Sequence, residues 1–445
     1  YLTPDQAERL RLGSQKKVIL TPILRDWLHK YNQIDFHGAT YAFSESNIEQ
    51  AIEELQRIEF VDGVRIANEQ AYDRLTLGTS LEQRIDGDRK SFNLHYIDWQ
   101  TPANNVYHFT AEYPVLREGR TDTYRPDIVL FVNGIPLAVI ENKRPDLQTK
   151  KGTPVDQAIS QQARNQDVDE GIPRLFLYSQ LLLAMDGQTG RYATAGTPKQ
   201  FWAVWKEKYD DPREEERDTT FLRKQKNHKD AKAWDNIFTG DFTYARTHFE
   251  ALYQGEISLT DQDRLIYYLL RPERLIELAY RFIVFDASVK KVARYQQYFA
   301  VQRAMDRIRD REQGQGRKGG VIWHTQGSGK SLTMVMLAKA LSLEKSIPNP
   351  RVIIVTDRID LDQQITKTFK NCGKETYQAK SGRHLLRLLR EGKAEVITTI
   401  LDKFYKPQEE GYVEESPDVF VLVDESHRSQ YGEANVRMRQ VLPNA

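Results

Sequence analysis

The chain has 445 residues, of which 40% are hydrophobic and 29% are charged, and its formal net charge is only +1. These values predict a soluble globular protein of two or three domains with a sizeable core. They exclude membrane helices, because no apolar run approaches the roughly 20 residues that such a helix needs, and they exclude an overall basic field. Cys372 is the only cysteine, which excludes an intrachain disulfide and favours a cytoplasmic location.

Two acids and a lysine flank a predicted hairpin in the first third of the chain. Asn133-Gly134 lies between two apolar runs, which is a strong hairpin signal. If the loop has three residues, 133–135, then Asp127 lies opposite Glu141, and Lys143 points to the same face as Glu141. Such a hairpin would gather two carboxylates and an amine at one point.

The alternative is a loop of only two residues. It would pair Asp127 with Ile140 and send Glu141 to the other face of the hairpin. Pro136 has no amide hydrogen for a ladder bond, which favours the longer loop. The sequence therefore favours the register that joins Asp127 to Glu141, with the other register left open.

Carboxylates placed this close together predict a cation site. Two adjacent carboxylates repel each other unless a cation lies between them, and hard oxygen ligands suit Mg²⁺. Asp127 and Glu141 are therefore candidate magnesium ligands and catalytic residues, with Lys143 positioning a nucleophile near the metal. The plainer alternative is a surface hairpin whose acid and lysine form an exposed ion pair of little energetic value.

Residues 1–235 are predicted to form one α/β domain. Apolar runs at 174–178 and 180–185 predict further strands of its sheet. The stretch 207–232 is dense in both charges and poor in apolar residues, so we expect an exposed insertion there. After it, 236–292 is expected to be a helical linker, because apolar residues recur at helical spacing over 263–286.

A phosphate-binding loop is predicted near residue 325. The apolar run Gly320–Trp323 predicts a buried strand, and 332–343 is apolar at helical spacing. Small residues between them would let backbone N–H groups surround phosphate oxygens at a helix N-terminus. Lys330 would reach the β- and γ-phosphates, and the Ser331 hydroxyl would hold Mg²⁺. The residues expected to bind nucleotide here are Thr325, Gln326, Gly327, Ser328, Gly329, Lys330 and Ser331.

The second half of the nucleotide site follows a predicted strand at Val419–Val423. Ligands of a doubly wound sheet lie at the carboxyl ends of its strands. Asp424 is therefore expected beside the phosphate loop as a magnesium ligand, and Glu425 as the catalytic residue that orients or deprotonates the attacking water.

Two more β-branched strands are predicted between these halves, each followed by a helical stretch. They are 351–357 and 395–399. Residues 293–445 are thus expected to form a doubly wound parallel-sheet domain with a phosphate loop.

This second domain resembles superfamily 2 helicases and DNA translocases. Asp424-Glu425-Ser426-His427 is similar to their D-E-x-H motif, and 294–300 looks like their Q-motif. The resemblance implies ATP as a cofactor, with Gln297 reading adenine and His427 in the nucleotide site. It also implies DNA contacts at 356–358 and 398–400. We expect one RecA-like lobe, the second lobe being absent.

The first domain resembles PD-(D/E)xK nucleases. Asp127, Glu141 and Lys143 fall on the three motif positions. In the RecB-like branch of that class an upstream helical acid is common, and Glu49 is the candidate, although Ser46-x-x-Glu49 is also a capping box. That branch also carries a downstream Q-x-x-x-Y, which is degraded here, since Gln161 is followed four residues later by Asn165.

A nuclease followed by a motor on one chain resembles the restriction (R) subunit of type I restriction–modification enzymes. Further matching stretches are Gly134–Leu137, Trp323–Ser331 and Asp424–Gln430, and His324 is ordinary in that family. The resemblance implies a type I site-specific deoxyribonuclease, in which ATP-dependent translocation along double-stranded DNA is coupled to Mg²⁺-dependent double-strand cleavage. Its implied partners are methyltransferase (modification) and specificity subunits, with no membrane.

Two alternatives remain open. One is a self-sufficient helicase–nuclease of DNA repair, which would prefer single strands and need no methyltransferase. The other is a nucleotide-gated DNA clamp whose acids bind metal without cutting. In each case local basic clusters must supply the DNA contacts, although charge runs are more often simply solvated. The candidates are Lys143-Arg144, Lys150-Lys151 and Arg223-Lys224-Gln225-Lys226.

Overall fold

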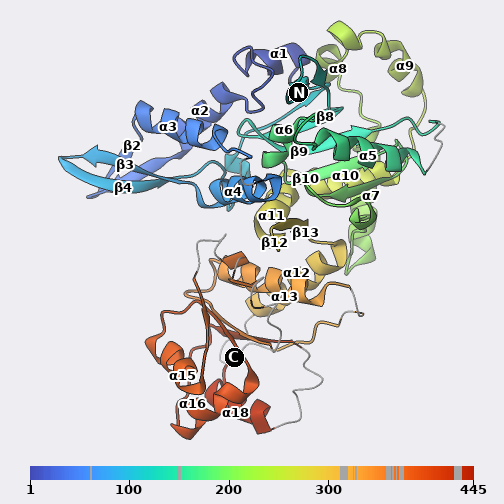
Figure 1. The fold of residues 1–445 in the computed structure, drawn as a ribbon. Helices are drawn as coiled ribbons and strands as arrows, with labels where there is room; N and C mark the ends of the chain where they lie inside the picture. Colours follow the sequence, from blue (N-terminus) through green and yellow to red (C-terminus); the bar gives the residue numbers. More distant parts are fainter. Residues whose placement is uncertain are drawn as a thin grey trace. The chain divides into compact units, whose positions relative to one another are not determined.

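The computed structural model describes residues 1–60, 63–147, 152–310, 319–323, 325, 328–356, 362, 365–366, 368–369, 375–424 and 433–445, with Asp241 described by its backbone alone. By their contacts the residues form two compact units (Figure 1). Unit 1 contains Tyr1–Tyr280 and Ser288–Val292, and unit 2 contains Arg281–Ala287 and Ala293–Ala445.

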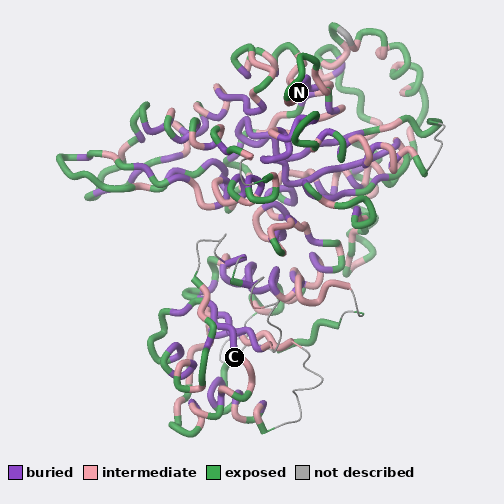
Figure 2. The backbone as a smooth tube through the Cα atoms, in the orientation of Figure 1, coloured by how far each residue is buried: buried purple, intermediate pink, exposed green. Residues whose placement is uncertain are grey.

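Unit 1 is built on a mixed five-stranded sheet. Its strand order is β11 (Gly190–Ala193), β10 (Leu181–Met185), β9 (Ile135–Asn142), β8 (Ile128–Val132) and β5 (Tyr107–Ala111). Only β9 and β10 run parallel to each other. These two central strands are almost wholly buried (Figure 2), which explains why they read as continuous apolar runs rather than alternating ones.

The hairpin β8–β9 has a two-residue turn followed by a β-bulge. Val132 pairs with Ile135, so the loop is Asn133-Gly134 alone and the three-residue loop is wrong. Beyond Phe131 and Pro136 the register shifts by one residue, because Leu137 is extra on β9, and Ile128 then pairs with Ile140. The bulge thereby brings Asp127 level with Glu141, as the longer loop would have done.

The turn of this hairpin is buried inside the unit. Asn133 and Gly134 both have positive φ, 52° and 80°, as a type I′ turn requires. The Asn133 side chain accepts from Val106 N at 2.8 Å and donates to Tyr96 O at 3.0 Å. A Cβ on Gly134 would lie 2.6 Å from the carbonyl oxygen of Leu20. These contacts hold the turn end of the hairpin in one position.

One predicted strand of this domain is a helix. Residues 174–178 lie in α6 (Pro173–Tyr178), so the strand prediction there is wrong. Proline at the first helical position suits a helix start, and every residue from Leu175 to Tyr178 is buried. A short, fully apolar run does not distinguish a buried helix from a buried strand by its periodicity. The strand predicted at 180–185 is confirmed as β10.

Helices and small hairpins surround the sheet of unit 1. The helices are α1 (Pro4–Arg9), α2 (Thr21–Tyr31), α3 (Glu45–Gln56), α4 (Val64–Leu77), η1 (Pro102–Asn104), α5 (Pro154–Asn165), η2 (Lys199–Phe201), α7 (Pro212–Lys226), α8 (Ala231–Ile237), η3 (Gly240–Phe242), α9 (Ala245–Leu252), α10 (Asp261–Leu270) and α11 (Pro272–Arg281). The outer strands are β1 (Gln33–Phe36), β2 (Ala39–Ala42), β3 (Thr79–Ile85), β4 (Asp88–Leu94), β6 (Val115–Leu116), β7 (Thr123–Tyr124) and β13 (Val289–Val292).

Residues 236–292 were expected to form a helical linker between domains, but most of this segment belongs to unit 1. Its helices α10 and α11 belong to unit 1 by their contacts. Arg274 of α11 donates to Glu207 at 2.8 Å, and both side chains are below 10% exposed. The Tyr72 hydroxyl also donates to the carbonyl oxygen of Ala279 at 3.0 Å. Amphipathic spacing shows that a helix buries one face but does not show against which domain.

Unit 2 has a four-stranded sheet that is all parallel, as predicted, although its strand Thr376–Gln378 was not predicted. Its order is β15 (Thr376–Gln378), β16 (Val396–Thr399), β14 (Arg351–Val355) and β17 (Val419–Val423). The remaining described elements are β12 (Ile283–Asp286), α12 (Tyr295–Arg309), α13 (Lys330–Ser342), α15 (Gly382–Glu391), η4 (Leu401–Phe404), α16 (Tyr405–Glu409) and α18 (Glu433–Val441).

The strand predicted before the phosphate loop is absent from the described residues. Val321, Ile322 and Trp323 are 73%, 39% and 89% exposed and form no strand. An apolar run becomes a buried strand only when a neighbour supplies its backbone hydrogen bonds, and no described strand pairs with this run. Among the described helices, none is both long enough and apolar enough to cross a membrane.

We expect Gly134→Ala to destabilise unit 1 by about 2 kcal/mol or more, because it combines an unfavourable positive φ with a clash against Leu20. The matched control is Gly87→Ala in the β3–β4 turn, where φ is +93° and nothing lies within 4 Å of the new methyl group. Urea unfolding followed by tryptophan fluorescence would measure both changes. Equal losses at the two glycines would show that the buried turn is not constrained by its surroundings.

Candidate functional site

The ends of β8 and β9 bring together the three groups predicted from the hairpin. Glu141 is near the end of β9 and its side chain is fully buried. The carboxyl group of Asp127 lies within hydrogen-bonding reach of Glu141. The Lys143 ammonium donates to Glu141 Oε1 at 2.5 Å. The structure therefore assembles Asp127, Glu141 and Lys143 at one point.

Backbone contacts fix the positions of these side chains. Asp127 Oδ2 accepts from the backbone N–H of Asn142 at 2.6 Å. The backbone N–H of Lys143 donates to Met185 O at the end of β10, at 2.8 Å. The site is thus built on the ends of paired strands, which hold side chains more rigidly than a loop does.

Glu141 has one oxygen that lacks a donor. Its Oε2 is buried and no described group donates to it, while its neighbour Asp127 is another acceptor. Burial raises the pKa of Glu141 to about 7, the charge of Asp127 raises it as well, and Lys143 opposes both effects. Two carboxyl groups in this arrangement are joined only by a shared proton or by a cation.

A divalent cation fits this donor set. Asp127 and Glu141 offer hard carboxylate oxygens of the kind that Mg²⁺ prefers, and the buried Oε2 supplies an oxygen in need of a positive partner. Within the described part of the chain, no three His, Cys, Asp or Glu side chains stand together as a metal site. The fit is therefore to a cation that is held by two carboxylates and completes its shell with water.

Glu112 is an acid of this site that the sequence analysis missed. It follows β5, has a φ of 51°, and its backbone N–H donates to Asp127 O at 2.9 Å. Burial raises the pKa of its carboxyl group, as does the charge of Asp127, while Arg125 and Lys143 oppose the shift. Glu112 also lines a cavity of about 300 Å³ with Arg125. The strand β5, which ends just before Glu112, was not predicted, so no sequence motif indicated this residue.

The upstream acid Glu49 is used elsewhere in the fold. Its carboxylate accepts from Arg25 Nε at 2.7 Å. The N-cap of α3 is Ser44, whose side chain accepts from Asn47 N, so the capping box from Ser46 to Glu49 is wrong. Ser46 already lies inside the helix, which begins two residues earlier than that capping box implies.

The helix α5 buries Gln162 rather than Gln161. Gln162 Nε2 donates to Leu183 O on β10 at 2.7 Å, and Gln162 is fully buried. Leu183 pairs with Ile140, the residue before Glu141. Gln161 is only partly buried. The signal was present in the sequence, because Gln162 falls on the buried stripe of the helix at Val155, Ala158, Ile159, Gln162 and Asn165.

In unit 2, Gln297 contacts the phosphate loop directly. Its Nε2 donates to Gly329 O at 3.1 Å, and its Oε1 accepts from Arg294 N at 2.9 Å. Gly329 has a φ of +87°, and a Cβ there would lie 2.6 Å from Gln297 Nε2. The positive φ favours glycine at 329, and a larger residue there would also displace the amide of Gln297 from the loop. The amide of Gln297 is tied to the loop backbone, and its reading of adenine stays a prediction.

The other described residues of the nucleotide site lie at element ends. Lys330 and Ser331 open α13, Ser328 Oγ donates to Thr325 O at 2.6 Å, and Asp424 follows β17 with its N–H donating to Val355 O. Several predicted residues lie outside the described ones: Gln326, Gly327, Glu425 and His427 of the site, and Lys150, Lys151, Asp357 and Arg358 of the DNA contacts.

We expect the stability of unit 1 to fall as pH rises from about 4.5 to 7 in EDTA. In this window the unfolded Glu141 loses its proton while the folded one, with its pKa raised to about 7, keeps it. The loss amounts to about 3 kcal/mol and is absent from Glu141→Gln. Urea unfolding at several pH values measures it, with the exposed Glu59→Gln as control. Parallel pH profiles for wild type and Glu141→Gln would contradict the assignment.

Comparison with known proteins finds similar sequences for both parts of the chain. Residues 1–201 match the family model "Type I restriction enzyme R protein N terminus", and 296–445 match "SWI2/SNF2 ATPase". A putative type I restriction enzyme endonuclease subunit of Methanocaldococcus jannaschii is 30% identical over 84% of the chain and 34% of its own length. The HindI endonuclease subunit of Haemophilus influenzae is 29% identical over 96% and 37%.

The chain thus spans about a third of the length of these curated relatives. The two model matches fall in separate structural units, one in unit 1 and the other in unit 2. Over the residues that the comparisons cover, the chain belongs to the endonuclease (R) subunits of type I restriction enzymes.

Proposed function

We propose that the chain carries a Mg²⁺-dependent nuclease of the PD-(D/E)xK type in unit 1 and the first RecA-like lobe of an ATP-driven DNA translocase in unit 2. The observation that carries this proposal is the buried Glu141 carboxyl group, which faces Asp127 and binds Lys143 at 2.5 Å. Such a cluster has no evident structural purpose, because burying like charges together costs stability.

The nuclease proposal assigns a role to each of the three groups. Asp127 and Glu141 hold the cation, and the strand ends fix the distance between them. Bound there, Mg²⁺ would lower the pKa of a water molecule and offset the negative charge on the phosphate oxygens. Lys143 keeps its ammonium group beside Glu141, where it can orient the nucleophile and stabilise developing charge on the phosphate oxygens.

The motor proposal rests on the parallel sheet and the loop before α13. Lys330 and Ser331 stand at the N-terminus of α13, where backbone N–H groups favour phosphate. Asp424 follows the carboxyl end of β17, the edge at which ligands of such sheets bind. The match to an SWI2/SNF2 ATPase model supports ATP as the nucleotide. Glu425 is proposed to orient the attacking water, with His427 in the same site.

The assembly proposal follows from the curated relatives, which are named as endonuclease subunits of type I restriction enzymes. We infer that methyltransferase and specificity subunits bind the protein and supply sequence recognition. The motor would then pull duplex DNA towards the complex, and cleavage would fall at distant, unspecific positions. ATP hydrolysis on duplex DNA that needs the methyltransferase complex would support this; hydrolysis without it, chiefly on single strands, would favour a repair helicase–nuclease.

We expect Lys143→Ala in the full-length protein to reduce DNA cleavage by roughly 10²–10³-fold, as loss of one charge-stabilising donor does elsewhere. ATP hydrolysis by the assembled enzyme should stay nearly unchanged, because Lys143 lies in unit 1. Cleavage of plasmid DNA and release of phosphate measure the two activities in one reaction. Lys30→Ala, an exposed lysine on α2, is the control. Joint loss of both activities would contradict separate sites.

We expect Lys330→Ala to abolish ATP binding, translocation and, in the assembled enzyme, cleavage. The lysine supplies the positive charge for the terminal phosphates, and its alanine variant keeps the helix that carries it. Triplex displacement measures translocation and a fluorescent ATP analogue measures binding, with the exposed Lys345→Ala as control. Cleavage that survives the Lys330 change would show that DNA transport is not required for cutting.

A further inference from the structure

A dense run of positive charge begins in the last turn of the charged helix α7 of unit 1 and ends in the first turn of α8. The ten residues 223–232 contain five lysine or arginine side chains and one histidine, against a single acid, Asp230. The whole chain, by contrast, has a net charge of only +1. The basic members of this run, called the basic run below, are Arg223, Lys224, Lys226, His228, Lys229 and Lys232.

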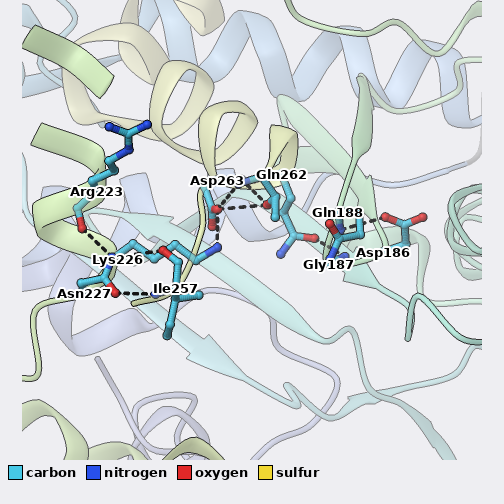
Figure 3. Close-up of polar contacts among 10 residues, drawn as sticks. Asp186, Gly187, Gln188, Arg223, Lys226, Asn227, Ile257, Gln262 and Asp263 are labelled. Carbon is cyan, nitrogen blue, oxygen red and sulfur yellow. Dashed lines mark hydrogen bonds and ion pairs between the residues drawn. The ribbon is translucent and has the colours of Figure 1, made fainter. Parts of the chain in front are cut away.

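Among the described residues of the unit, an acid neutralises one of these cations. Lys226 Nζ donates to Asp263 Oδ2 at 2.5 Å, and both side chains are largely buried. Arg223, Lys224 and Lys232 are exposed and form no hydrogen bond or ion pair through their side chains with any described residue. Figure 3 shows the guanidinium group of Arg223 directed away from the polar contacts around Lys226. Three cations are therefore available to an outside anion.

The basic run is tied firmly to the body of unit 1. The side-chain amide of Asn227 donates to Ile257 O at 3.1 Å and accepts from Ile257 N at 2.7 Å (Figure 3). Asp263, the partner of Lys226, also accepts from Thr260 N at 2.7 Å as part of the cap of α10. A run of charged residues that is simply solvated does not need hydrogen bonds that hold its backbone against the rest of the unit.

The same contacts lead from the basic run to the nuclease site. Next to Asp263, Gln262 accepts from Gly187 N at 2.6 Å through Oε1 and donates its own N–H to Gln188 O at 3.1 Å (Figure 3). Gly187 belongs to the turn after β10, whose last residue, Met185, accepts from Lys143 N. A continuous series of hydrogen bonds and covalent links thus joins Lys226 to the backbone of Lys143.

The nuclease site itself repels its proposed substrate. Asp127, Glu141 and Glu112 place carboxyl groups where a DNA phosphate would have to approach, with Lys143 and Arg125 as the nearby cations. Duplex DNA is held mainly by cations that neutralise its phosphates. Cations outside the site would offset this repulsion, and the contacts of Lys226 and Asn227 hold the backbone that carries them, which lowers the entropy lost on binding.

We propose that the basic run 223–232 is a docking surface for the backbone of duplex DNA, with Arg223, Lys224 and Lys232 each neutralising one phosphate of the DNA that the proposed nuclease site cuts. The inference rests on the proposed nuclease function and extends it to the position of the substrate. Contacts of this kind carry no sequence information, which agrees with cleavage at unspecific positions.

The test is the salt dependence of DNA binding by the full chain. A fluorescein-labelled duplex of about 40 base pairs is titrated in EDTA without ATP, at KCl concentrations from about 50 to 200 mM. In Arg223→Ala/Lys224→Ala/Lys232→Ala we expect the slope of log Kd against log[KCl] to fall by about 2.7, that is, about 0.9 for each phosphate. Near 0.1 M salt, binding should weaken by roughly 10²-fold.

The matched control removes three exposed cations from other elements of unit 1: Lys30→Ala/Arg65→Ala/Arg84→Ala. It should keep the wild-type slope, and circular dichroism should show that both triple variants fold. Equal slopes for the two variants would overturn the inference while leaving the nuclease proposal intact, provided that the wild type in the assembled enzyme still cuts DNA with Mg²⁺. A wild type that neither binds nor cuts duplex DNA would overturn both.

Discussion

The register of the β8–β9 hairpin is the constraint on which the proposed nuclease site depends. Side chains alternate between the two faces of a strand, so a shift of one residue would turn Glu141 away from Asp127. The buried Asn133-Gly134 turn sets the start of the register, and the bulge at Leu137 corrects it by one residue. The acids meet only because these two irregularities act together.

The pairing of Asp127 with Glu141 could be predicted from the sequence, although the two-residue turn and the β-bulge that produce it could not. Periodicity and turn signals identify β8, β9, β10 and the parallel sheet of unit 2, because burial on both faces leaves apolar runs of strand length. The β-bulge could not be predicted in this way, because one extra apolar residue in β9 does not change the continuous apolar pattern of the strand. The strand predicted at 174–178 failed for a related reason, as burial on all sides removes the period that separates helix from strand.

The residues that sequence reasoning missed are those whose role depends on distant neighbours. Glu112 reaches the site through the pairing of β5 with β8, a contact between segments that no local motif describes. Gln162 could have been found, because it occupies the buried stripe of α5. The raised pKa of Glu141 could not be predicted either, because it arises from burial and from the charge of Asp127, and both follow from the tertiary fold.

The interior position of the Asn133-Gly134 turn has an evolutionary consequence. Exposed turns such as the one between β3 and β4 can gain or lose residues without disturbing what the strands carry. A length change between Asp127 and Glu141 would either break the contacts of Asn133 or reverse the face of one acid. Relatives that retain cleavage should therefore show this stretch as an ungapped block, even where their surface hairpins differ in length.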